Sequence, residues 1–203
     1  MYFYGYIADM EIPSETGPEP LVVSDHPALD LLNTVANVEG QAFDFFRTDG
    51  DVIRWLVRLG MAPEGSSPKA PRQALLEAAR SLRETVRGLV LRRKEGKKAD
   101  PSGLNAALRA AETHPELVWE SPGSPRLQRK RELRTPEQFL APLAESAAEL
   151  LSSGDFDLVR PCGNHECSLW FYDRTKSHRR RWCSMAVCGN RHKVAAFRQR
   201  QLE

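Results

Sequence analysis

Four cysteine thiols lie close together near the C-terminal end of the chain and could hold a metal ion. Cys162, Cys167, Cys183 and Cys188 form two C-x4-C pairs with 15 residues between them. Thiolates bind zinc tetrahedrally, and a separation of four residues lies within the usual range for paired ligands. A short segment with few apolar residues also needs the free energy of metal binding to offset its chain entropy. We therefore predict one zinc ion, and a structural one, because four cysteines leave no open coordination position.

Three other uses of the four cysteines are open. Two disulfides would need an oxidising compartment, but Asp9 and Glu11 occupy the part of the N-terminal segment where a secretion signal would be apolar. An iron–sulfur cluster usually shows tighter C-x2-C runs than the two pairs found here. Unliganded thiols are the third alternative, although four of them within 27 residues would be an unusual cluster.

The second cysteine pair sets a condition on the local backbone. At ~100° per residue, an uninterrupted helix would point Cys183 and Cys188 about 140° apart. Both can therefore face one metal only if a helix starts or breaks between them, and Gly189 would provide a break. Three histidines of the same region could replace a cysteine as ligand, although surface or DNA-facing positions suit them better. These are His165, His178 and His192.

The basic residues gather in the same part of the chain. Residues 160–203 contain ten Lys/Arg and three acidic residues, a net charge of +7, while the 19 basic and 24 acidic residues before them give −5. Such a positive potential attracts a polyanion, and guanidinium groups can hold phosphates or read guanine edges. We therefore expect DNA as the partner, with a merely solvated surface as the alternative. The candidate DNA-binding residues are Arg174, Lys176, Arg179, Arg180, Arg181, Arg191, Lys193, Arg198 and Arg200.

Membrane proteins and enzymes are the two classes that the sequence does not favour. No apolar run approaches the ~18 residues that span a bilayer, so we expect no membrane partner and a cytoplasmic location. The sequence shows no Gly-rich phosphate loop, no G-x-S-x-G elbow and no cluster of nucleophile, base and carboxylate. We therefore expect no catalytic residues and no enzyme activity. The oligomeric state is not determined by the sequence.

The rest of the chain is predicted to be mostly helical. Apolar residues at helical spacing predict helices over residues 25–35, 49–60, 75–90, 100–111 and 135–151. Asp25 would cap the first of these helices, and Thr135 with Gln138 would form a capping box for the last. Residues 21–23 are a strand candidate, and residues 117–119 and 126–133 are predicted to pair as a hairpin around the turn-rich SPGSP.

The predicted fold class is mainly α with a small antiparallel β element. We expect a loose leader over residues 1–20, a helical N-terminal domain over residues 21–158 and a small zinc finger over residues 159–203. The aromatic residues of the last segment would form a miniature core around the zinc, because few other apolar side chains are available there. Stacking on single-stranded bases is the alternative. These residues are Trp170, Phe171, Tyr172 and Trp182.

A polar stripe runs along the first predicted helix. Asp30, Asn33, Thr34 and Asn37 follow one another at short steps on an otherwise apolar segment. One explanation is the solvent face of an amphipathic helix, which normally carries such residues. The other makes Asp30 and Asn33 a buried hydrogen-bonding pair that lines a pocket for a small-molecule ligand, as a sensor domain would need.

Two segments resemble known protein families. The segment from Cys162 onward resembles the CGNR zinc finger, a C-terminal module of bacterial proteins, because aromatic residues precede Asp173, Arg181-Trp182-Cys183 follows a basic run, and Cys188-Gly189-Asn190-Arg191 ends the motif. Upstream, HPALDLLNTVAN (residues 26–37) is similar to the opening motif of the ABATE domain, which commonly precedes such fingers. Family members are described as stress-induced transcription regulators, and this description implies DNA binding.

These observations together predict a regulator that binds DNA. A helical sensor or interaction domain would precede a structural zinc finger with four cysteine ligands, and the finger would bind duplex DNA through phosphates first. The alternative is a zinc-stabilised module that docks a protein or RNA and does not bind specific DNA.

Overall fold

The computed structural model describes residues 18–121 and 123–194 of the 203-residue chain. Most of the predicted leader lies outside the described residues, and so do two of the candidate DNA-binding residues, Arg198 and Arg200. Below, residues 18–158 are called the helical body and residues 159–194 the finger.

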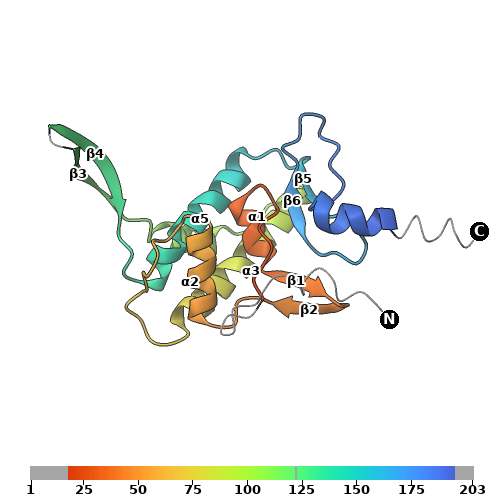
Figure 1. The fold of residues 1–203 in the computed structure, drawn as a ribbon, viewed down its shortest axis with the longest axis horizontal. Coiled ribbons are helices and arrows are strands. Elements are labelled where there is room, and N and C mark those ends of the chain that lie inside the picture. Colours follow the sequence, from red (N-terminus) through yellow and green to blue (C-terminus); the bar gives the residue numbers. More distant parts are fainter. Residues whose placement is uncertain (1–17, 122, 195–203) are drawn as a thin grey trace, which may run out of the picture.

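Five α-helices form the helical body (Figure 1). They are α1 (Pro27–Leu32), α2 (Asp49–Arg58), α3 (Ala74–Lys94), α4 (Ser102–Leu108) and α5 (Pro136–Ser153). Within the described ranges no helix is both long and apolar enough to cross a lipid bilayer.

Three two-stranded antiparallel sheets accompany the helices in the described residues, where the sequence predicted a single hairpin. Their strands are β1 (Val35–Val38) with β2 (Gln41–Asp44), β3 (Thr113–Ser121) with β4 (Ser124–Arg131), and β5 (Val159–Pro161) with β6 (Trp170–Tyr172). The fold is therefore largely helical, with more β structure than expected.

The core of the helical body lies between α3 and α5, and α1 packs against both helices. The regularly spaced apolar residues that predicted α3 form its buried side, which includes Leu75 and Val86. From α5, Phe139 and Leu143 are fully buried against it. Because burial of each such side chain contributes about 1.5–3 kcal/mol, this helix pair is a main source of apolar stabilisation.

Capping boxes fix the starts of α2 and α5. The predicted box at α5 is confirmed, since the Thr135 hydroxyl accepts from the Gln138 N–H and the Gln138 side chain accepts from the Thr135 N–H. Thr48 and Asp51 form an equivalent box at α2. Both boxes satisfy backbone N–H groups that would otherwise lack a partner at a helix start.

The first helix is shorter than predicted, and its cap is a different residue. The helix ends at Leu32, so Val35 lies in β1. His26 is the N-cap, because its Nδ1 accepts the N–H of Ala28 at 3.2 Å, whereas Asp25 adopts a left-handed backbone with φ of 57°. The strand expected over residues 21–23 is not formed.

The β1–β2 hairpin was missed because its turn signal is incomplete. Glu39 and Gly40 connect the strands with φ of 52° and 84°, the two positive values of a type I′ turn. Gly40 adopts such a backbone without strain, but a glutamate at the first position is an uncommon turn residue.

A buried ion pair attaches this hairpin to α3. Arg83 is 4% exposed, and its two terminal nitrogens each lie 2.8 Å from a different carboxylate oxygen of Asp44 on β2. The same guanidinium donates to the hydroxyl of Thr34 at 3.0 Å. Such a bidentate geometry fixes the direction of both side chains.

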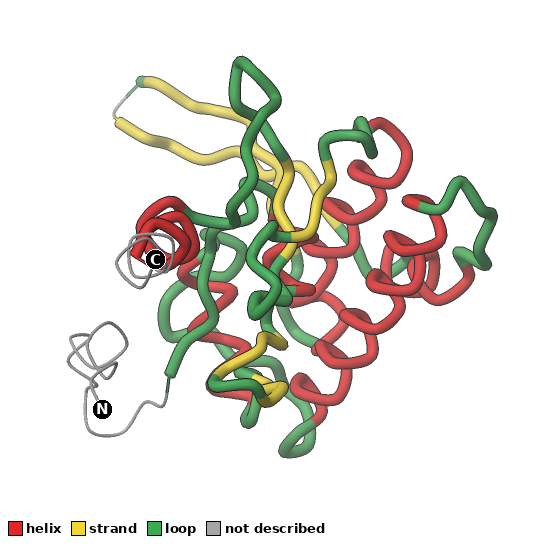
Figure 2. The backbone as a smooth tube through the Cα atoms, turned by 90° about the vertical axis from the view of Figure 1, so that its right-hand side faces the viewer, coloured by secondary structure: helices red, strands yellow, loops and turns green. Residues whose placement is uncertain are grey.

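The β3–β4 hairpin extends away from the helical body in both views (Figures 1 and 2). Its pairing register places Leu117 opposite Leu127 and Trp119 opposite Pro125, which gives one apolar face. Leu117, Trp119 and Leu127 are 60%, 65% and 70% exposed. The opposite face carries ion pairs such as Lys130 with Glu116. The alternation was predicted correctly, although β3 is longer than expected.

Candidate metal centre and the basic surface around it

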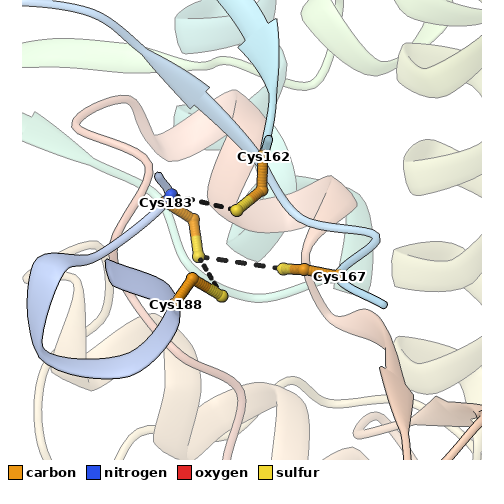
Figure 3. Close-up of side chains that lie close together, drawn as sticks. All are labelled: Cys162, Cys167, Cys183 and Cys188. Carbon is orange, nitrogen blue, oxygen red and sulfur yellow. Dashed lines mark hydrogen bonds between the residues drawn. The ribbon is translucent and has the colours of Figure 1, made fainter. Parts of the chain in front are cut away.

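The four cysteine sulfurs converge on one point (Figure 3). All lie within 4.8 Å of one another, and the sulfur of Cys183 is 3.5 Å from that of Cys188 and 3.8 Å from that of Cys167. A tetrahedral zinc ion with bonds of about 2.3 Å would separate its sulfur ligands by about 3.8 Å. The same separations exceed the ~2.05 Å of a disulfide. The donor set therefore fits zinc.

Local structure explains how each cysteine reaches this point. Cys162 follows β5, and Cys167 lies in the loop that leads to β6. Between Cys183 and Cys188 the chain starts a π-helical turn, η1 (Met185–Gly189), for which Ser184 is the N-cap. The predicted condition is thus met, because a helix begins between the two cysteines. Gly189 is not the break, since residues 190–194 continue as a helix.

Hydrogen bonds to sulfur prepare the site for an anionic ligand set. The backbone N–H of Cys183 donates to the sulfur of Cys162 at 3.3 Å. Thiol hydrogen bonds from Cys167 and Cys183 lower the pKa of Cys188 far below that of a free thiol, with smaller contributions from Cys162 and Asn164. Because cysteine binds zinc as the thiolate, binding of the ion must release the protons that the thiols carry.

The histidines considered as substitute ligands lie outside the cysteine cluster. The group of side chains close enough to share one ion consists of the four cysteines. All three histidines are exposed. His178 places its Nδ1 3.2 Å from the carbonyl oxygen of Asp173, and the ring of His192 lies 4.7 Å from that of Trp182.

Gly163, next to the first ligand, is required by a close backbone approach. Its N–H donates to the carbonyl oxygen of Arg181 at 2.7 Å, and a Cβ at this position would lie 2.9 Å from the same oxygen. We expect Gly163→Ala to lower the free energy of unfolding by about 1–3 kcal/mol, the usual cost of overpacking. Chemical denaturation followed by tryptophan fluorescence would measure it.

The matched control is Gly88→Ala in α3, where an added Cβ meets no atom within 4 Å. That substitution should stabilise the chain by about 0.5–1 kcal/mol through helix propensity. Equal effects of the two alanines would contradict the proposed role of Gly163.

Most of the predicted DNA-binding residues in the described range are exposed. Four lie in the segment of residues 173–181, here called the basic loop, which follows β6 (Figure 1). Two more lie in the helix of residues 190–194. The six are Arg174, Lys176, Arg179, Arg181, Arg191 and Lys193.

Arg180 is the exception, because its guanidinium is bonded within the chain. Its guanidinium points into the chain, where it lies 4.4 Å from the centre of the Phe171 ring and donates to the carbonyl oxygen of Val23 at 2.7 Å. It also bonds the carbonyl oxygen of Cys183 and the carboxylate of Asp25. With its donors used internally and its side chain 17% exposed, Arg180 holds the finger together.

The buried carboxylate of Asp173 organises the basic loop from within. It accepts from the Thr175 hydroxyl at 2.6 Å and from the Arg180 backbone N–H at 2.9 Å, and Arg160 lies 3.4 Å away. Burial alone would raise the pKa of Asp173, but these donors outweigh it and lower the pKa. The loop is therefore tied down at both ends.

The polar stripe predicted for the first helix begins in α1 and continues beyond it, since Asn33 is the C-cap and Asn37 lies in β1. Its interpretation as a solvent face is wrong for three of its four residues, which are buried. Asp30, Asn33 and Thr34 are at most 3% exposed, and Asn37 alone is exposed. The Asp30 carboxylate accepts the backbone N–H groups of Val23 and Ser24, both at 3.0 Å. Burial raises the pKa of Asp30, against the effect of these hydrogen bonds.

Asp30 and Asn33 are buried, as the pocket interpretation required, and the polar groups of both side chains are bonded within the chain. Asn33 donates to the carbonyl oxygen of Trp170 at 2.9 Å and accepts the Trp170 N–H at 2.8 Å. Two hollows on the described surface, one beside Trp55 and one between α3 and α4, are lined by other residues. The side-chain amide of Asn33 joins β6 to α1, a role that no local sequence signal indicates.

The aromatic residues of the finger are packed rather than free. Phe171 is fully buried among the cysteines, and Trp182 packs against the same cluster. Trp170 and Tyr172 pack instead on the core of the helical body. The β6 strand lies beside α1 (Figure 1). The aromatic side chains thus form two cores, one around the metal site and one beneath it.

A tetrathiolate site built from a short hairpin and a helix start defines a zinc-finger protein, here with a helical N-terminal part. Residues 159–201 match the sequence profile of the CGNR zinc finger, and the four cysteines hold one structural zinc ion. Residues 25–154 match the ABATE profile, described as "Putative stress-induced transcription regulator". Because this match covers more than half of the chain, the protein belongs to the ABATE family. No curated protein matches the chain.

Proposed function

We propose that the protein is a transcription regulator whose finger binds the phosphate backbone of duplex DNA. The family description supports a regulatory role, and a zinc-stabilised finger is a common means of reaching DNA. The observation that carries the proposal is the set of six exposed cations on the finger. The role proposed is cytoplasmic and non-catalytic.

The finger presents these cations with little opposing charge. Within residues 159–194 there are two acidic residues, and Asp173 is buried and used internally, which leaves Glu166 as the exposed one. The basic loop is also held by Asp173 and Arg180 before any partner arrives. A preformed loop loses less conformational entropy on binding than a free one. Exposed guanidinium groups on such a loop suit phosphate oxygens.

Duplex DNA fits this surface better than a single strand. Proteins that bind single strands stack bases on exposed aromatic rings. Here Phe171 is buried, and Trp170, Tyr172 and Trp182 pack against the two cores. The remaining attraction is electrostatic, so we expect binding through phosphates first.

Fluorescence anisotropy of labelled duplex DNA at several salt concentrations tests the proposal. If about six phosphates are neutralised, log K should fall against log salt with a slope of about −5. The triple variant Arg174→Gln/Lys176→Gln/Arg179→Gln should bind more weakly, and its slope should be smaller in magnitude by about 2–3.

The control removes the same charge from exposed positions of the helical body, as Lys69→Gln/Arg72→Gln/Arg109→Gln. It should leave the slope almost unchanged. Binding that is insensitive to salt, or no binding at low salt by zinc-loaded protein, would reject the proposal. Stronger competition by RNA or by an acidic protein than by duplex DNA would favour the alternative of a docking module.

A further inference from the structure

The finger is fastened to the segment of residues 21–37, here called the α1 segment. Two reciprocal hydrogen bonds join Asn33 to Trp170, at 2.8 and 2.9 Å. On either side, the Tyr172 N–H donates to the Ser24 carbonyl oxygen at 2.7 Å, and the Asn37 N–H donates to the Ser168 hydroxyl at 2.8 Å. Each of these bonds involves either a residue of β6 or Ser168, which lies two residues before this strand.

The first connection from this contact to the metal runs through the β5–β6 hairpin. Trp170 pairs with Pro161, and the carbonyl oxygen of the preceding Leu169 accepts the N–H of Cys162 at 2.8 Å. Cys162 in turn accepts the N–H of Cys183 through its sulfur. The strand that Asn33 holds is therefore one residue from a direct bond to a zinc ligand.

The second connection runs through Arg180. Its guanidinium bonds the carbonyl oxygen of Cys183 and, with the same group, the Val23 carbonyl oxygen and the Asp25 carboxylate. One side chain thus joins a residue that binds zinc to the segment that leads into α1. Apolar contacts follow the same path, since Leu21, Val23 and Ala36 pack against the cysteine cluster.

Within the finger the metal is the main support of these two connections, although Trp170 and Tyr172 also pack on the core of the helical body. The buried apolar cluster of the finger has five members, and three of them are the ligands Cys162, Cys183 and Cys188. Without the ion, the cysteines no longer hold the carbonyl oxygen of Cys183 beside Arg180, and β5 is joined to the basic loop by polar bonds such as that of Arg160 to the His178 carbonyl oxygen. So small a core does not offset the chain entropy of the segment.

We propose that zinc acts as a latch between the finger and the α1 segment, so that loss of the ion releases β6 from Asn33 while the rest of the helical body stays folded. Linkage makes the effect reciprocal: if zinc strengthens the contact, the contact must strengthen zinc binding by the same factor. Asn33 would then control metal retention from outside the ligand set.

The zinc affinity of the full-length protein tests this reciprocity. Equilibrium competition for zinc with a chromophoric chelator, under reducing conditions, measures that affinity. Asn33→Leu and Arg180→Leu should each weaken zinc binding roughly tenfold, within the 5–150-fold range of typical coupling energies. The controls are Asn105→Leu and Arg179→Leu, both at exposed positions, which should bind zinc with the unmodified affinity. Equal affinities of all four variants would overturn the proposal.

Hydrogen exchange of the unmodified chain, with and without zinc, gives a second measurement that does not depend on folding of a variant. Removal of zinc should speed exchange at least tenfold at the amides of Trp170, Tyr172 and Asn37, which bond across the contact. Amides in α3 and α5 should keep their protection. Unchanged exchange at Asn37 while the finger exchanges freely would show that the finger melts alone and would overturn the latch. Loss of protection throughout α3 and α5 would overturn it as well.

Discussion

Cys183→Ser should abolish stoichiometric zinc binding and unfold residues 159–194. Cys183 is fully buried and lies within hydrogen-bonding distance of two other ligands, so no neighbouring side chain can replace it. Structural zinc contributes about 10–16 kcal/mol to small finger peptides near pH 7, and a hydroxyl is not deprotonated there to take the place of a thiolate. At its upper limit, this free energy is larger than the about 5–15 kcal/mol by which most single domains are stable.

Elemental analysis of the purified variant and two-dimensional amide NMR would measure the two effects. The expected result is less than one zinc per chain and loss of dispersed signals from residues 159–194. Ala186→Ser is the matched control, since residue 186 is exposed in the same turn between Cys183 and Cys188. One tightly bound zinc in Cys183→Ser would show that three cysteines suffice and would contradict the assignment.

The second large effect is expected at the buried ion pair of the helical body. Asp44→Ala removes the bidentate partner of the Arg83 guanidinium, which is 4% exposed, and leaves Glu84 as its acidic partner at 3.1 Å. Because Asp44 is itself 28% exposed and Glu84 remains, we expect a loss of about 3 kcal/mol, the lower end of the range for breaking a buried pair. Urea denaturation would measure the change. Glu120→Ala removes the partner of Arg126 in an exposed ion pair and should cost no more than about 1 kcal/mol.

A double variant distinguishes a stranded charge from lost packing. Asp44→Leu/Arg83→Met replaces both charges by apolar groups, and it should recover much of the loss seen in Asp44→Ala. If the double variant is as unstable as the single one, loss of the carboxylate beside the buried guanidinium is not the cause.

The same pair predicts how acid affects stability. Burial alone would raise the pKa of Asp44, but the hydrogen bonds and charge of Arg83 outweigh it, so the pKa lies below the ordinary value of 3.8. The folded state therefore binds the proton more weakly than the unfolded state. The stabilisation is complete above pH ~4 and is lost as the pH falls through the folded value, so the difference between the unmodified chain and Asp44→Ala should shrink there.

The parts that could be predicted from the sequence are those coded by near neighbours. Helical periodicity located α3, and the Thr135–Gln138 box located the start of α5. The metal site was found because cysteine is rare and chemically specific, so four in 27 residues are informative whatever the backbone does. The requirement that a helix start or break between Cys183 and Cys188 followed from geometry alone, although the break suggested at Gly189 is not formed.

The parts that could not be predicted depend on partners far away along the chain. Arg180 stands in a run of three arginines, and its bonds to Val23 and Asp25, 157 and 155 positions away, separate it from its exposed neighbours. Asn33 is likewise explained by Trp170, 137 positions away. The β5–β6 hairpin has strands of three residues, too short for the alternation that revealed β3–β4.

The contact between β6 and α1 also limits how this protein can be divided into fragments that fold on their own. A break after Leu158 follows the boundary between the two family matches, yet it would strip the buried sides of Trp170 and Tyr172 and leave the amide of Asn33 unsatisfied. The boundary between the two family matches is therefore not the boundary of an independently folding unit. Anyone grafting this finger onto another carrier would have to transplant residues 21–37 along with it.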